Sequence, residues 1–182
     1  MLPNSLLSLP IMRFVTRRGL LTGAGAIAAA SAASPANAQA TPSHLRFFNP
    51  TGIAKPAGYT HVVEMTGPGR TIYIAGQLGY DATGKRAGEV GDFQAQATQV
   101  FENLKIALSA VGAGFEHVVK LNNYLTNISN LSIFRTVRDK YITGTPPAST
   151  TIEISKLARP EALLEIEAIA VLPANAKVIP VR

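Results

Sequence analysis

The stretch LLEIEAIAV, residues 163–171, decides the fold, because its two alternating sets of side chains differ in character. Successive side chains of an extended strand point to opposite faces. The even-numbered set is uniformly apolar, and the odd-numbered set mixes two carboxylates with large aliphatic side chains. The even set is Leu164, Ile166, Ala168 and Ala170, and the odd set is Leu163, Glu165, Glu167, Ile169 and Val171. We expect the even set to pack against helices.

The odd-numbered face is too apolar for open water and too polar for a core. Such a face suits an interface between subunits that encloses a wet pocket. The alternative is a solvated face that carries a few exposed aliphatic side chains, because single exposed apolar residues are common on proteins.

Six further elements are predicted upstream of this strand. Two strands, 59–65 and 70–79, flank a Gly-Pro-Gly turn and are read as a hairpin. A helix begins after Asp92 and is stopped by Gly112 and Gly114. A strand over 117–125 leads to a second helix, capped by Ser129 or Asn130, and a strand over 149–155 follows.

Both helices carry apolar residues at three- and four-residue steps, so each has one buried face. The two faces consist of Phe93, Ala97, Val100, Phe101, Leu104, Leu108 and Val111, and of Leu131, Phe134, Val137 and Tyr141. The element order is β-β-α-β-α-β-β. It predicts an α+β fold in which a mixed sheet, with hairpins at both ends, is covered on one face by two helices.

The first 40 residues differ from the rest of the chain, because they contain no acidic residue. Arg17 and Arg18 precede an alanine-rich apolar run and the small-residue sequence Ala36-Asn37-Ala38. This order is typical of a cleaved export signal, here of the twin-arginine type. We therefore expect a signal over 1–38, an N-terminal arm over 39–57 and the folded domain over 58–182, in a periplasmic or secreted protein without stable membrane association. A mitochondrial presequence or an uncleaved membrane anchor is the alternative.

Composition excludes several kinds of site. The chain has no cysteine, and its three histidines are far apart in sequence, so a metal site is not expected. The formal charge is +6, from 17 basic and 11 acidic residues. Removing 1–38 takes away three arginines and no acid, which leaves 14 against 11, or +3. The remaining basic residues are scattered, so nucleic acid is not an expected partner.

Three segments resemble the Rid proteins (reactive intermediate deaminases, also called the YjgF or L-PSP endoribonuclease family). They are AGQLG (75–79), FENLKIALSAVGAGFEHVVKLNNYL (101–125) and PPASTTIEISKLARPEALLEIEAIAV (146–171). The resemblance implies a chorismate-mutase-like fold that assembles as a homotrimer, with small-molecule pockets between neighbouring subunits. It also implies hydrolysis of imines or enamines to a keto acid and ammonia without a metal or organic cofactor.

The resemblance also implies roles for individual residues. Glu165 matches the glutamate that is associated with the hydrolytic water, and Tyr59 matches a tyrosine that closes over the ligand. The other positions that match the family's pocket are Gly76, Asn103 and Thr151.

The chain departs from the family pattern at Ser149. Rid deaminases carry an arginine directly after Pro-Ala, and its planar fork holds the substrate carboxylate. Ser149 cannot neutralise a carboxylate. No other residue is an obvious substitute, since Arg138 is expected on the second helix and Arg159 in a turn. We expect Ser149, Thr150 and Thr151 to form a neutral polar site.

Three functions remain open at this stage. The first is a hydrolase or deaminase of an imine, enamine or related C–N compound that is not anchored by a carboxylate. The second is an exported, non-catalytic trimer that binds a small polar or aromatic ligand. The third is a ribonuclease, which is disfavoured because the sequence shows no cluster of His or Lys beside a phosphate site.

Overall fold

The computed structural model describes residues 44–180, so the expected signal over 1–38 and the first residues of the expected arm lie outside it. The strands are β1 (Leu45–Phe48), β2 (Val62–Met65), β3 (Gly69–Leu78), β4 (Val118–Leu125), β5 (Ala148–Glu153) and β6 (Leu164–Pro173). The helices are α1 (Phe93–Ala110) and α2 (Leu131–Tyr141), with short 3₁₀ turns at Phe115–His117 and Ile128–Asn130. In this part of the chain, no helix combines the length and apolar character needed to cross a membrane.

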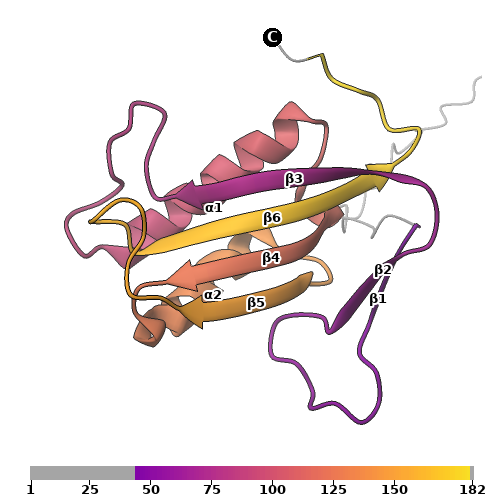
Figure 1. Ribbon diagram of the computed structural model, residues 1–182, viewed down its shortest axis with the longest axis horizontal. Helices are drawn as coiled ribbons and strands as arrows, with labels where there is room; N and C mark the ends of the chain where they lie inside the picture. Colours follow the sequence, from indigo (N-terminus) through magenta and orange to yellow (C-terminus); the bar gives the residue numbers. More distant parts are fainter. Residues whose placement is uncertain (1–43, 181–182) are drawn as a thin grey trace, which may run out of the picture. The chain divides into compact units, whose positions relative to one another are not determined.

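The main sheet has the strand order β3-β6-β4-β5, and both helices lie on one of its faces (Figure 1). β6 is antiparallel to both of its neighbours, whereas β4 and β5 are parallel. The chain passes from β4 to β5 through α2, and such a crossover is the usual connection between parallel strands. The predicted α+β fold, with two helices on one face of a mixed sheet, is confirmed.

Both predicted end hairpins are wrong. β2 pairs with β1, which lies inside the segment expected to be an arm, and β3 pairs with β6. β5 does not pair with β6, because β4 lies between them. The physical reason is ladder length: β3 and β6 each have ten residues and share a long ladder, whereas β2 has only four residues to offer.

The predicted alternation on β6 is confirmed. Each even-numbered side chain from Leu164 to Ala170 is at most 3% exposed and belongs to the core beneath the helices. Among the odd-numbered residues, Leu163, Glu165, Glu167 and Ile169 are half-buried and Val171 is buried. This second side of the sheet, called the open face below, also carries Tyr73 and Ile152, which are 79% and 43% exposed.

The helix ends match the predictions in part. Asp92 caps α1, and its Oδ1 accepts a hydrogen bond from the Ala95 amide at 2.9 Å. The chain leaves α1 through Gly112, which has a φ of +77°. Asn130 occupies the cap position of α2 but makes no side-chain cap; instead Asn127 caps the preceding 3₁₀ turn. The predicted side-chain cap from Ser129 or Asn130 is therefore wrong.

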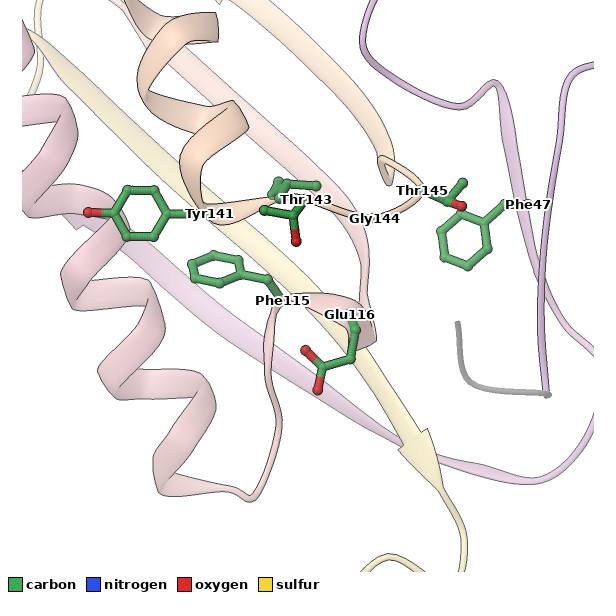
Figure 2. Close-up of a pocket in the computed structure, with 8 residues that line it drawn as sticks. Phe47, Phe115, Glu116, Tyr141, Thr143, Gly144 and Thr145 are labelled. Atoms are coloured by element: carbon green, nitrogen blue, oxygen red, sulfur yellow. The ribbon is translucent and has the colours of Figure 1, made fainter. Parts of the chain in front are cut away.

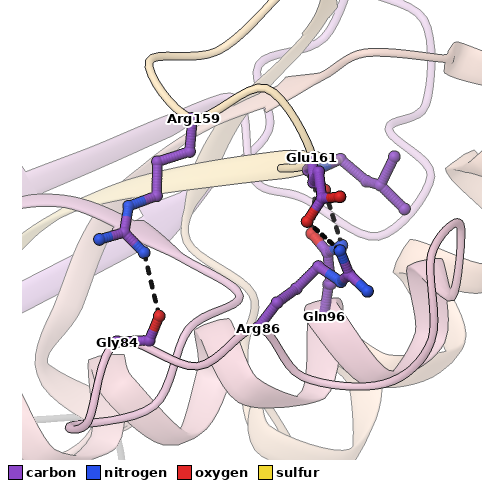
Figure 3. Close-up of polar contacts among 6 residues, drawn as sticks. Gly84, Arg86, Gln96, Arg159 and Glu161 are labelled. Atoms are coloured by element: carbon purple, nitrogen blue, oxygen red, sulfur yellow. Dashed lines mark hydrogen bonds and ion pairs between the residues drawn. The ribbon is translucent and has the colours of Figure 1, made fainter.

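A polar network attaches the loop before β6 to α1 (Figure 3). Gln96 is fully buried; its Nε2 donates to the Glu161 carbonyl, and its Oε1 accepts from the Leu163 amide, both at 2.9 Å. Arg86 forms an ion pair with the Glu161 carboxylate. Arg159, in the turn where the sequence placed it, donates to the Gly84 carbonyl at 3.3 Å and lies over the Tyr80 ring. These contacts fix where β6 enters the sheet.

We expect the substitution Gln96→Leu to lower the free energy of unfolding by about 1–3 kcal/mol, because it leaves the Glu161 carbonyl and the Leu163 amide, which bond to Gln96 in partly buried positions, without their partner. The measurement is urea denaturation of the full chain. Gln94→Leu, at an exposed position on the same helix, is the matched control. Equal effects of the two substitutions would contradict a structural role for the Gln96 amide.

Candidate functional site

A cavity with a volume of about 210 Å³ lies between α2, the start of β5 and the loop before β2. Tyr59, Ser149 and Thr151, three of the predicted site residues, line it together. The remaining lining residues are Ala57, Ile128, Leu131, Phe134, Arg135 and Arg138. We call it the α2 cavity. Its size suits a small organic molecule, and its wall combines apolar side chains with hydroxyls and two cations.

Asn123 on β4 orders the hydroxyl side of the α2 cavity. It is 1% exposed, and its Nδ2 donates to the Thr150 carbonyl at 3.0 Å. The same nitrogen lies 2.9 Å from Ser149 Oγ and 3.1 Å from Thr151 Oγ1. Ser149 and Thr151 therefore share one side of β5, the side of the helices, and Asn123 fixes their positions. Sequence reasoning missed Asn123. Its only signal was a polar side chain on the same face of the strand as the apolar residues Leu121 and Leu125.

The loop that carries Tyr59 is attached to the chain just before Ser149. Thr60 is 3% exposed; its amide donates to the Pro147 carbonyl at 3.0 Å, and its hydroxyl donates to the Pro146 carbonyl. Tyr59 is half-buried and makes an edge-to-face contact with His61. The loop and the start of β5 therefore form one continuous wall of the α2 cavity.

Two arginines from α2 also reach the α2 cavity, and sequence reasoning gave them no role. Arg138 is 7% exposed, and its Nε and Nη2 donate to Asp139 Oδ1 at 2.9 and 2.7 Å. Arg135 is exposed and makes no ion pair or hydrogen bond with any residue in 44–180. The signal in the sequence was their spacing, because residues three apart share one face of a helix.

The open face of the sheet holds Glu165 and Glu167. Asn122 and Tyr124 donate to Glu167 Oε2 at 3.3 and 3.1 Å, and the hydrogen bond to Glu167 raises the pKa of Tyr124. Glu165, in contrast, makes no hydrogen bond or ion pair within residues 44–180. Of the two carboxylates, only Glu165 retains its full capacity to accept hydrogen bonds.

Gly76 provides the space that Glu165 occupies. The register between β3 and β6 shifts between Ile74 and Gln77, which places Gly76 in a β-bulge. A Cβ atom at Gly76 would collide with the Glu165 carboxylate, so only glycine allows this approach. The structure thus brings together Gly76 and Glu165, two of the residues expected in the pocket.

The remaining predicted residues lie elsewhere. Thr150 points to the open face, where Lys120 Nζ lies 2.6 Å from its hydroxyl. Asn103, on α1, uses its Nδ2 to donate to the carbonyls of Leu78 and Tyr80 at 3.0 and 2.9 Å, and it lines a separate groove. Within one chain, Glu165 and the hydroxyls of the α2 cavity therefore lie on opposite faces of the sheet.

A further pocket lies beside the end of α2, where Phe115, Glu116 and Tyr141 surround it (Figure 2). Its volume is about 20 Å³, which is space for about one water molecule rather than a substrate. Burial, with a smaller contribution from a hydrogen bond to Glu102, raises the pKa of Tyr141 to about 12. We assign this pocket to packing. In the described part of the chain, no cluster of three or more metal-ligating side chains occurs.

Comparisons with known proteins show which family the chain resembles. The profile of the family described as Endoribonuclease L-PSP matches residues 51–172. Protein DfrA of Myxococcus xanthus is 37% identical over 113 residues, which are 62% of this chain and 84% of that protein. A 2-iminobutanoate/2-iminopropanoate deaminase of Mus musculus is 35% identical over 115 residues, or 62% of this chain and 80% of that protein.

A solved structure extends the likeness to the fold. The Rid-family protein YyfB of Yersinia pestis superposes with a TM-score of 0.65 at 37% sequence identity, over 71% of this chain and 99% of that chain. The match of the family profile covers more than half of the sequence, and both helices and all of the main sheet except Pro173 lie within it. The chain belongs to the Endoribonuclease L-PSP family, which includes the Rid proteins.

Proposed function

We propose that this protein hydrolyses a small imine or enamine, with Glu165 as the general base. The observation that carries the proposal is the difference between the two carboxylates of the open face. Asn122 and Tyr124 engage Glu167, whereas Glu165 is half-buried against Gly76 and has no partner within residues 44–180. Relatives named as imine deaminases, at 31% and 35% identity, support the reaction class.

The chemistry requires one placed water and a proton relay. As the water oxygen attacks the imine carbon, Glu165 takes one proton from the water and passes it to the nitrogen. When the resulting carbinolamine collapses, its hydroxyl proton also goes to the nitrogen, the C–N bond breaks and ammonia leaves. The product is the corresponding keto compound. The hydroxyls of Ser149 and Thr151 and the Tyr59 ring supply polar and apolar contacts for the remainder of the substrate. General base catalysis of this kind contributes about 100- to 10,000-fold to a rate.

We further propose that the working site forms between copies of the chain in a homotrimer. Glu165 and the α2 cavity lie on opposite faces of one sheet, so a single copy does not bring them together. A neighbouring copy packed on the open face would add its own α2 cavity to Glu165. The exposure of Tyr73 and Ile152 on that face supports this packing, because large apolar side chains favour burial.

We expect Glu165→Gln to lower kcat for imine hydrolysis by about 100-fold or more, because the amide cannot accept the proton from water. The substrate is generated in situ by an amino-acid oxidase acting on an amino acid, and release of the keto acid is measured. Glu167→Gln is the matched control, because glutamine keeps an oxygen that can accept from Tyr124 and Asn122; its activity should remain within a few-fold of wild type.

Sedimentation equilibrium on the same samples tests the assembly. A trimer is expected for all variants, and an active monomer would contradict the shared site. A third variant, Ser149→Arg, restores the arginine that Rid deaminases carry at this position. If wild type, Glu165→Gln and Ser149→Arg are all inactive while remaining trimeric, the hydrolase proposal fails and the alternative of a non-catalytic binding trimer replaces it.

We also propose that residues 1–38 direct export through the twin-arginine route. Replacing Arg17 and Arg18 together by lysine should abolish export, because the route reads the arginine pair. The measurement is the mass of the protein in the periplasmic fraction. For wild type, this mass should correspond to a chain that begins at Gln39, and the double variant should be missing from the fraction. Recovery of the uncleaved chain from the membrane fraction would instead indicate an anchor.

A further inference from the structure

We propose that Arg138 and Arg135 of α2 form an anion anchor in the α2 cavity, which therefore takes a small molecule carrying a carboxylate. The inference rests on the proposed function only in treating this cavity as the ligand site. It differs from the expectation of a neutral site, which considered position 149 alone. Ser149 on β5 carries no positive charge, and in its place Arg135 and Arg138 of α2 bring positive charge to the same cavity.

The first step of the argument is the state of Arg138. Its side chain is only 9% exposed, and one edge of the guanidinium bonds to Asp139, whose side chain is 61% exposed. Within residues 44–180, no partner is found for Nη1 of Arg138. A buried cation is stable only when it is paired and hydrogen-bonded, so a charge that lines a cavity with donor capacity to spare favours an anionic ligand.

The second step is the way the chain holds the guanidinium in place. Gly58 has a φ of +78°, and a Cβ atom there would collide with Nη2 of Arg138. The left-handed turn and the missing side chain at Gly58 thus create the space for the charged group, directly beside Tyr59. The ring of Phe134 lies 5.9 Å from the guanidinium carbon on another side. The arginine is therefore built into the wall rather than free in solvent.

The third step is the charge balance of the wall. The lining residues include Arg135 and Arg138 and no acidic residue. Asp139 pairs with Arg138, and Glu153, which is not part of the lining, accepts a hydrogen bond from the Ile128 amide at 2.8 Å. The positive groups that line the cavity itself therefore face no carboxylate within the lining. Ile128, Leu131 and Phe134 add apolar surface to the same wall. A small organic acid provides both parts, because its carboxylate can pair with an arginine fork and its carbon chain can contact the apolar side.

The test is isothermal titration of the full chain with 2-oxobutanoate and with its neutral amide, 2-oxobutanamide. We expect the carboxylate to bind about 10- to 100-fold more tightly than the amide, as is typical for a hydrogen bond to a charged group. Arg138→Gln should remove this preference, and Arg135→Gln should reduce it. Lys140→Gln, on the same helix but outside the lining, removes the same charge and should leave the preference unchanged.

Four outcomes would overturn the proposal. The first is equal affinity for the acid and the amide, and the second is a preference for the acid that survives both arginine substitutions. The third is a loss of this preference in Lys140→Gln as large as in the arginine variants. The fourth is inorganic phosphate binding as tightly as the carboxylate. If Arg138→Gln does not fold by circular dichroism, Arg135→Gln carries the test, because its exposed position tolerates the change. Imine hydrolysis without carboxylate preference would refute the anchor alone, and arginine-dependent carboxylate binding without hydrolysis would refute the hydrolase alone.

Discussion

The central position of β6 is the constraint on which the rest of the structure depends. Its four even-numbered apolar side chains are almost completely buried beneath α1 and α2, while its backbone pairs with β3 on one side and β4 on the other. A shift of one residue in either ladder would turn these side chains to the open face and place two carboxylates in the core. The burial of this one strand therefore sets the register of the whole sheet and the face on which each polar group lies.

The two parts of the candidate site follow from that register. Glu165 takes the open face because its neighbours in sequence occupy the core. Ser149 and Thr151 take the helix side because β5 pairs in parallel with β4, opposite Leu121 and Asn123. A chain built in this way separates its unpartnered carboxylate from its cavity. The same alternation that makes the core is therefore the reason why we propose a site shared between copies of the chain.

Periodicity in the sequence predicted which segments form helices and strands, but it did not predict which strands pair. Apolar spacing is a local property, and it located α1, α2 and β6 correctly. Strand pairing depends on non-local ladder length, and the four residues of β1 carry too little alternation to be recognised. For the candidate site, family resemblance drew attention to Glu165 and Ser149, and their roles stay predictions. Sequence alone assigned no role to the side chains that surround Ser149 in the α2 cavity, because the roles of Asn123, Arg135 and Arg138 depend on how a strand and a loop approach α2.

The bonds of Thr60 have a consequence for the order in which the protein folds. The Thr60 hydroxyl reaches the Pro146 carbonyl across 86 positions of sequence. Contacts between distant residues form slowly, because closing a long loop costs entropy before the contact stabilises it. Two of the walls of the α2 cavity meet through this link, which requires the β4-α2-β5 unit to be in place first. We therefore expect the α2 cavity to be among the last features to form, so that a partly folded chain would lack it.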